Sequence, residues 1–74
     1  MTSIDAYNVF RRKEKPALQC AIRQDRSVPD FVCGGSWEYA GTISADSAPF
    51  GFKPKAARDA TAYIGYYLFH TLNG

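Results

Sequence analysis

The sequence predicts an α+β domain whose elements follow the order α-β-β-β-α. Two observations lead to this class: a segment of helical character opens at Lys53 and continues to about Leu72, and residues 17–24 alternate between apolar and polar side chains. Alternation with a period of two is typical of a half-buried strand. We therefore expect a three-stranded antiparallel sheet with two helices packed on one face, because a sheet must bury its apolar face against another layer.

The composition indicates one small domain covering residues 1–74, with 46% hydrophobic residues and a formal net charge of +2. Such a chain has enough apolar side chains for a packed core, so disorder is not expected. Cys20 and Cys33 are too few for a disulfide scaffold. We expect both to be reduced, half-buried strand residues of an intracellular protein, cytoplasmic or nuclear. The first ten residues lack a signal peptide's apolar run, and no segment is long enough to cross a membrane.

Residues 3–13 are expected to form the first helix. Ser3 suits an N-cap, and Pro16 would end the helix, because the residue before a proline avoids the α region. The apolar stripe would consist of Ile4, Val9 and Phe10. A strand is the competing interpretation, since aromatic and β-branched residues of this segment also favour sheets. We favour the helix.

The middle of the chain is expected to supply the sheet. The three extended segments are residues 17–24, 31–37 and 39–44. Residues 25–30 are a polar turn with a proline, and Gly34-Gly35 suggests a bulge. Residues 45–52, rich in Ser, Pro and Gly, are expected to be a loop that leads to the last helix.

The last helix has an unusual distribution of charge. Pro54 suits the first turn, while Lys53, Lys55 and Arg58 cluster at the same end. Cations there oppose the helix macrodipole, which favours negative charge. Together with the first-turn N–H groups, they indicate an anion site suited to phosphate. The alternative, that these are ordinary solvated surface charges, stays open at this point.

Four aromatic residues of the same segment wrap more than one face of the expected helix; they are Tyr63, Tyr66, Tyr67 and Phe69. Some of them must therefore leave the core, and exposed aromatic residues often mark a surface for a partner. We expect a protein partner or self-association through them. The alternative is that the rings lie on the surface with their hydroxyls in water.

The sequence predicts no catalytic site, no metal site and no cofactor. The chain has one histidine, His70, and no Cys–His spacing that supports a nucleophile. We therefore expect a protein that binds rather than catalyses, as a separate domain or as part of a larger catalytic protein.

The chain resembles the double-stranded RNA-binding domain over roughly residues 4–72. The resemblance is carried by the basic stretch Lys53-Pro54-Lys55-Ala56-Ala57-Arg58 and by Thr61-Ala62, which stands where the family has a pair of small residues. The expected order of elements also matches the family. So does a proline after the first helix, Pro16, and an aromatic residue at the start of the second strand, Phe31.

The resemblance implies a module that binds double-stranded RNA and recognises the shape of the A-form duplex rather than its sequence. The residues it assigns to RNA contact are Lys53, Lys55, Arg58, Asn8, Arg11, Arg26 and Ser27. The first three would hold phosphates across the major groove. Asn8 and Arg11 would share a face of the first helix and lie in one minor groove, while the loop that holds the last two would enter the next.

Two departures from the family's pattern favour a second function. Pro54 replaces the second lysine of the basic stretch, and residues 27–30 are Ser-Val-Pro-Asp where many RNA-binding members have Gly-Pro-x-His. Members that lack these features often contact proteins. A protein-interaction or dimerisation module on the same fold is therefore the alternative.

Overall fold

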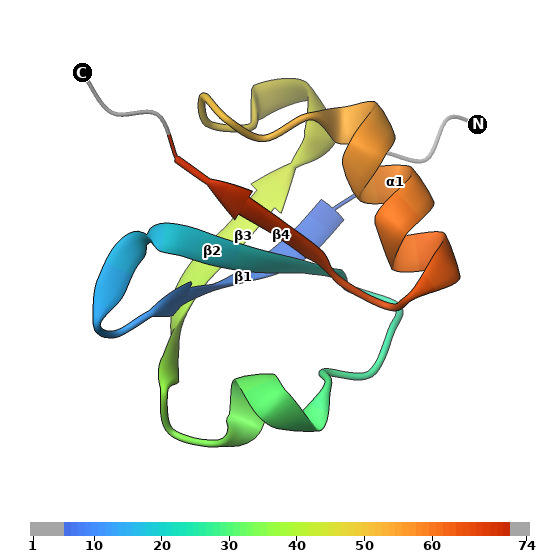
Figure 1. Ribbon diagram of the computed structural model, residues 1–74. Coiled ribbons are helices and arrows are strands. Elements are labelled where there is room, and N and C mark those ends of the chain that lie inside the picture. The colour runs from blue at the N-terminus through green and yellow to red at the C-terminus, as the bar shows by residue number, and fades with distance from the viewer. Residues whose placement is uncertain (1–5, 72–74) are drawn as a thin grey trace.

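The structure, a computed structural model, describes residues 6–71 and contains a four-stranded antiparallel sheet (Figure 1). The strands are β1 Ala6–Arg12, β2 Lys15–Arg23, β3 Trp37–Ser44 and β4 Tyr67–His70, in the spatial order β3-β1-β2-β4. The described residues contain a single α-helix, α1 Pro54–Tyr63, and two short 3-10 helices, η1 Asp30–Cys33 and η2 Ala45–Ser47. The expected three-stranded sheet with two helices on one face, in the order α-β-β-β-α, is therefore wrong.

The segment expected to be the first helix is strand β1 instead. It lies inside the sheet, where Val9 pairs with Ala21 of β2 and Tyr7 pairs with Ile43 of β3. Tyr7 and Val9 are buried on the side of α1, so alternate residues face one layer, as in any strand. The β-forming residues outweigh the partial helical spacing because both edges of β1 find partners. The expected N-cap, Ser3, lies outside the described residues.

The strand expected at residues 17–24 is confirmed as β2, but its burial differs from the prediction. Cys20, Ala21 and Ile22 are all fully buried, so β2 is covered on both faces rather than one. Pro16 does not end a helix, since it is the second residue of β2. A proline is tolerated there because the start of a strand does not require its N–H.

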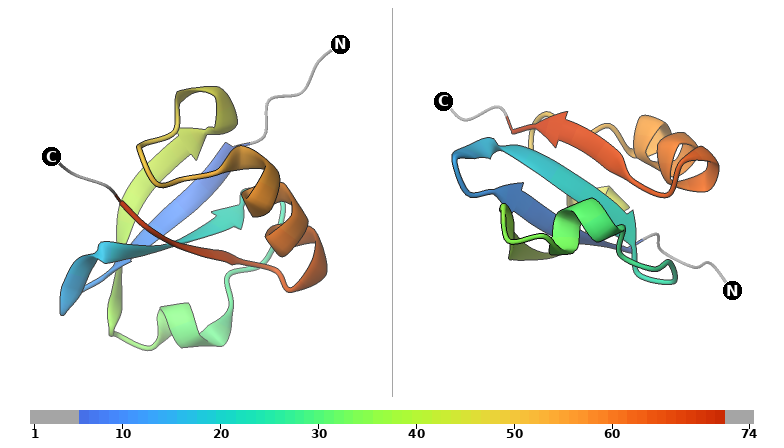
Figure 2. Two further views of the ribbon diagram at one scale, coloured as in Figure 1. Left: turned by 45° about the horizontal axis from the view of Figure 1, so that its top comes forward. Right: turned by 60° about the horizontal axis from the view of Figure 1, so that its bottom comes forward.

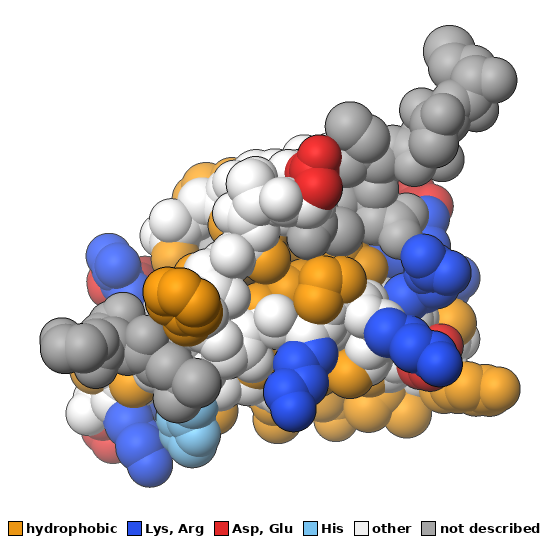
Figure 3. Space-filling model, turned by 90° about the horizontal axis from the view of Figure 1, so that it is seen from above, with side chains coloured by type: hydrophobic (Ala, Val, Ile, Leu, Met, Phe, Trp, Pro, Cys, Tyr) orange, Lys and Arg blue, Asp and Glu red, His pale blue; other side chains and the backbone are white. Residues whose placement is uncertain are grey.

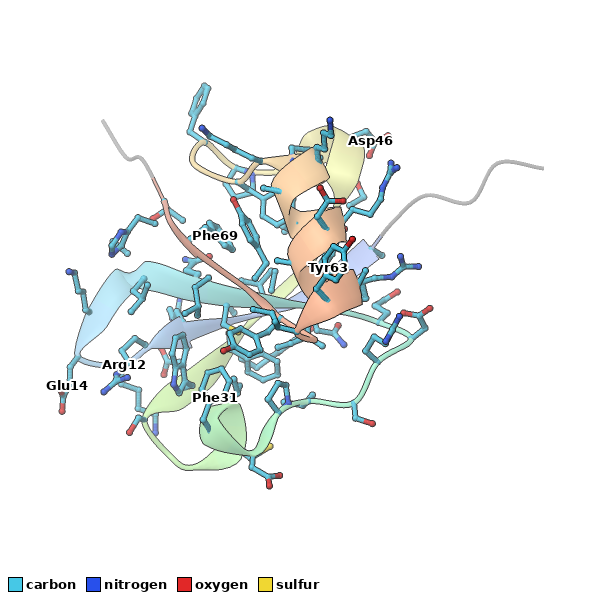
Figure 4. The ribbon with its side chains drawn as sticks, turned by 45° about the vertical axis from the view of Figure 1, so that its right-hand side comes forward. Arg12, Glu14, Phe31, Asp46, Tyr63 and Phe69 are labelled. Atoms are coloured by element: carbon cyan, nitrogen blue, oxygen red, sulfur yellow. The ribbon has the colours of Figure 1, made fainter. Side chains whose placement is uncertain are left out.

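Each face of the sheet has its own core. Figure 2 shows α1 on one side of the sheet and η1 on the other. The core beneath α1 consists of Tyr7, Val9, Ala21, Phe52, Ala57 and Phe69. The core on the opposite face, which η1 covers, consists of Cys20, Ile22, Val32 and Trp37. Figure 4 shows Phe69 and Phe31 on these two sides of the sheet. A chain of this size thus has three thin layers rather than the two that the alternating pattern suggested.

Residues 31–37 are not the second strand. Residues 30–33 form η1, which places Val32 in the core on the face opposite α1, and the chain then turns through Gly34 and Gly35 into β3. Gly35 has a φ of 93°, a conformation that favours glycine. The strand expected at residues 39–44 is confirmed, with its start at Trp37.

The last helix is shorter than predicted, because it ends at Tyr63 rather than near Leu72. Gly65 follows with a φ of 88°, the left-handed conformation that commonly ends a helix. The chain then reverses into β4, where Leu68 pairs with Cys20 of β2. In the part of the expected helix beyond Tyr63, Ile64 and Leu68 are exposed and Phe69 is buried from β4. Leu72, where the helix was expected to end, lies outside the described residues.

Candidate nucleic-acid interface

The start of α1 is exposed and carries the three predicted cations. Lys53 is the N-cap, Pro54 is in the first turn, and that turn contains no acidic residue. Lys55 and Arg58 are three residues apart, so they lie on the same side of the helix. All three basic residues are exposed, and neither lysine has an ion-pair partner among residues 6–71. We call Lys53, Lys55 and Arg58 the basic end of α1.

The inner side of α1 explains why this end is held in place. Ala57 and Thr61 are both fully buried against the sheet, where small side chains let the helix approach closely. The Thr61 hydroxyl donates a hydrogen bond to the Ala57 carbonyl at 2.8 Å, so this buried polar group is satisfied within the helix. The Lys53 carbonyl accepts the first helical hydrogen bond, from the Ala57 N–H at 2.9 Å.

The local charge at this end is positive. Residues 53–59 contain three basic residues and one acid, Asp59, which gives a formal charge of +2. Figure 3 shows this side of the molecule, with blue Lys and Arg side chains spread over the surface and hydrophobic side chains between them. An anion that approaches the first turn would meet both the lysines and the positive end of the helix dipole.

The turn before α1 presents a residue that the sequence analysis did not single out. The Phe52 N–H donates to the Pro49 carbonyl at 3.1 Å, and Gly51 has a φ of 97°. A positive φ at the third position is typical of a type II turn, in which Phe50 takes the second position. Phe50 is 82% exposed at the tip of this turn. The sequence Pro49-Phe50-Gly51-Phe52, directly before the basic stretch, indicates this turn.

The two residues expected to share a helical face lie on opposite faces of the sheet. Asn8 and Arg11 are three apart in a strand, so their side chains alternate. The Asn8 amide oxygen accepts a hydrogen bond from the Thr42 hydroxyl at 3.0 Å on the side away from α1. Arg11 donates from Nε to the Glu38 carboxylate at 2.6 Å, across the pair of strands β1 and β3. The expectation of a common face is therefore wrong.

The other two predicted residues, Arg26 and Ser27, are exposed in the loop after β2. The Arg26 N–H donates to the Arg23 carbonyl at 3.0 Å and closes a turn. Figure 1 shows this loop below the C-terminal end of α1, away from the basic end. The structure thus brings together the three cations of α1 but does not place Asn8, Arg26 and Ser27 beside them.

The two thiols differ in environment, and both are free. Cys20 lies in strand β2, as expected, but it is fully buried rather than half-buried. Burial raises the pKa of its thiol from 9.0 to about 11, although a backbone hydrogen bond from Tyr67 acts in the opposite direction. Cys33 is exposed at the end of η1, so the expectation of a half-buried strand residue is wrong for it.

Other kinds of site find little support in the described part of the chain. Between residues 6 and 71 no three or more His, Cys, Asp and Glu side chains gather in a way that would hold a metal ion. His70 is an exposed residue of β4 rather than the end of a helix. None of the helices in the same range has the length and hydropathy needed to cross a bilayer.

No family model, curated protein or solved structure matches this chain. The resemblance to the double-stranded RNA-binding domain therefore stays a prediction, and the order of elements that it implied is not the order observed.

Proposed function

We propose that this chain is a binding module for RNA that contacts phosphates through the basic end of α1. The observation that carries the proposal is the set of three exposed cations, Lys53, Lys55 and Arg58, at a helix start without an acidic residue. A helix selected for stability alone gains from Asp or Glu in its first turn. Cations in that position weaken the helix slightly and are expected where an anion is bound.

Backbone geometry supports the same conclusion. The first N–H groups of a helix have no partner within it, and Lys53 provides no side-chain cap. Pro54 has no N–H, and the Lys53 N–H donates to the Tyr67 hydroxyl at 3.4 Å, so the N–H groups suited to phosphate oxygens are those of Lys55 and Ala56. Lysine contributes a compact charge to such a site, and arginine contributes a planar set of donors that matches two phosphate oxygens.

The type of RNA is a separate part of the proposal. Recognition of a duplex, as the resemblance implied, relied on two helices and a loop on one face of the domain. The phosphate contacts do not require that arrangement, because any strand carries the same backbone charge. Double-stranded RNA is therefore one substrate to test beside single-stranded RNA.

The proposal is tested by titration with a 20-base-pair RNA duplex, one of its strands and the DNA duplex of the same sequence. We expect RNA binding at 50 mM salt that becomes about 20- to 40-fold weaker at 200 mM, as three phosphate contacts require. Lys53→Ala/Lys55→Ala should lose most of this binding. Lys13→Ala/Lys15→Ala removes the same charge from the exposed β1–β2 turn and should bind almost as wild type. Absence of RNA binding at 50 mM salt would refute the proposal.

A protein-interaction module is the second candidate, and one observation favours it. Tyr63 and Ile64 are adjacent at the C-terminal end of α1 and are 87% and 60% exposed. Figure 4 shows Tyr63 projecting from the helix away from the sheet. Tyr66 and Tyr67, which the sequence analysis also considered, instead pack partly into the two cores, and Phe69 is buried. Self-association through this surface predicts a mass in light scattering that rises with concentration, and Tyr63→Ser/Ile64→Ser should abolish the rise. A constant monomer mass would exclude self-association.

A further inference from the structure

We infer that Phe50 is a stacking platform for an unpaired nucleobase, so the RNA held at the basic end of α1 is single-stranded where it passes this turn. The inference rests on the proposed function and specifies its substrate. It starts from the ring contacts of the five phenylalanines, all of which lie in the described residues. Four of them contact another aromatic ring, and Phe50 alone does not.

The exposure of Phe50 does not contribute to the stability of the fold. At 82% exposure the ring keeps most of its apolar surface in water. Burial of that surface would stabilise the protein, so its position at the tip of a turn favours a role in binding. An exposed ring three residues before the first of these cations matches the chemistry of a nucleotide, which presents a flat apolar base next to a charged phosphate.

The turn holds this ring in a defined place. Phe52, two residues later, is buried among three aromatic rings, with centroid distances of 5.4 Å to Tyr7, 5.4 Å to Tyr67 and 5.1 Å to Phe69. The hydrogen bond from Phe52 to the Pro49 carbonyl closes the turn, and Pro49 restricts its own φ. Because the anchor is rigid, little conformational entropy is lost when a base stacks on Phe50.

The turn leads directly into the basic end of α1. Phe50 is three residues before Lys53, and the Lys53 N–H donates to the Tyr67 hydroxyl at 3.4 Å, which ties this junction to β4. A strand whose phosphates contact Lys53 and Lys55 can therefore bring a neighbouring base to the ring. The base must be unpaired, because bases inside a duplex already stack on each other and do not offer their faces to a side chain.

The test compares a 12-nucleotide single-stranded RNA with a 12-base-pair RNA duplex closed at each end by a non-nucleotide linker, so that the duplex contains no unpaired base. We expect Phe50→Ala to weaken single-strand binding about 5- to 150-fold, the range that loss of one stacked base produces. It should leave the slope of log affinity against log salt unchanged, because no phosphate contact is lost. Phe50→Tyr, which keeps an aromatic ring, should bind within about twofold of wild type.

The outcomes separate the inference from the proposed function. If Phe50→Ala binds single-stranded RNA as wild type does while Lys53→Ala/Lys55→Ala flattens the salt slope, the stacking role is refuted and the phosphate contacts stand. If Phe50→Ala weakens duplex and single strand equally, selection of unpaired bases is refuted. Absence of RNA binding by the wild-type chain would overturn both.

Discussion

Phe50 and Phe52 lie two residues apart in one turn and face opposite environments: Phe50 is 82% exposed and Phe52 is 7% exposed. The turn that separates them is closed by the hydrogen bond from the Phe52 N–H to the Pro49 carbonyl. One ring thus fixes the segment before α1 to the core, and the other is presented to solvent three residues before the basic end begins. Because both positions hold phenylalanine, the same substitution can be made at each, and its effects on stability and on binding can be compared.

Replacement of the two rings by alanine should have very different effects on folding. Phe52→Ala removes a ring from the core beneath α1 and should lower the free energy of unfolding by about 3–5 kcal/mol. That is a large part of the roughly 4–11 kcal/mol expected for a domain of this size. Phe50→Ala should change it by no more than about 0.5 kcal/mol. Urea denaturation monitored by circular dichroism measures both, and equal losses would contradict the described turn.

A glycine substitution tests where α1 ends. Gly65 has a φ of 88°, so Gly65→Ala should lower the free energy of unfolding by about 1–2 kcal/mol, the cost of a left-handed residue with a side chain. Gly34→Ala is the control, because the φ of Gly34 is −83° and an added Cβ would meet its nearest neighbour at 3.6 Å. We expect that variant to stay within about 0.5 kcal/mol of wild type. A harmless Gly65→Ala would indicate that the helix continues past Tyr63.

The buried thiol of Cys20 should make stability depend on alkaline pH. Its pKa is about 11 in the folded protein against 9.0 for an ordinary thiol, because burial disfavours the thiolate. The unfolded chain therefore releases this proton at a lower pH than the folded one. The contribution of Cys20 is fully present below pH 9 and is lost as pH rises from about 9 to about 11, by about 2–3 kcal/mol.

Cys20→Ala supplies the comparison for this pH effect, since other groups also titrate in that range. The free energy of unfolding of wild type should fall more steeply between pH 9 and 11 than that of the variant. Parallel curves would contradict a buried thiol. Alkylation gives a second readout, in which exposed Cys33 reacts rapidly at pH 8 and Cys20 reacts only as the protein unfolds.

The ion pair of Arg11 and Glu38 should have a small effect on stability. Both side chains are 45% exposed, so solvent screens the pair, and a double-mutant cycle with Arg11→Gln and Glu38→Gln should give a coupling of about 0.2–1 kcal/mol. Because the Arg11 guanidinium on β1 is already held by the Glu38 carboxylate on β3, Arg11→Gln should leave the salt slope of RNA binding unchanged. A slope reduced by about one unit would show that Arg11 contacts a phosphate.

Local signals in the sequence predict part of this fold. The alternation in residues 17–24 identifies β2, and Pro54 with the cluster of cations identifies the start of α1. The two large errors are the helices predicted for the segments that form β1 and β4, and they have a common cause. β1 and β4 acquire their structure from pairing with β2, and β4 is about fifty residues away from its partner along the chain. Gly65 marked the end of the helix, but the hydrophobic residues that follow it also fit a helical period.

The candidate site was also predictable only in part, where its residues are close together in the sequence. Lys53, Lys55 and Arg58 are close together in sequence, so the prediction that they share one helix end does not depend on the rest of the fold. The pairing of Asn8 with Arg11 depended on a helix and failed when the segment became a strand. Phe50 was passed over because exposure of an aromatic residue is decided by tertiary packing, which places Phe52 in the core and leaves Phe50 outside it.

The most direct test of the account is the slope of log affinity against log salt for RNA, measured with wild type and with Lys53→Ala/Lys55→Ala. Two lost phosphate contacts should flatten the slope by about 1.4 units for a single strand and about 1.8 units for a duplex. Lys13→Ala/Lys15→Ala, with the same change in net charge, should keep the wild-type slope. Equal slopes for wild type and the α1 variant would show that the basic end of α1 does not contact phosphate, and the central claim would then be wrong.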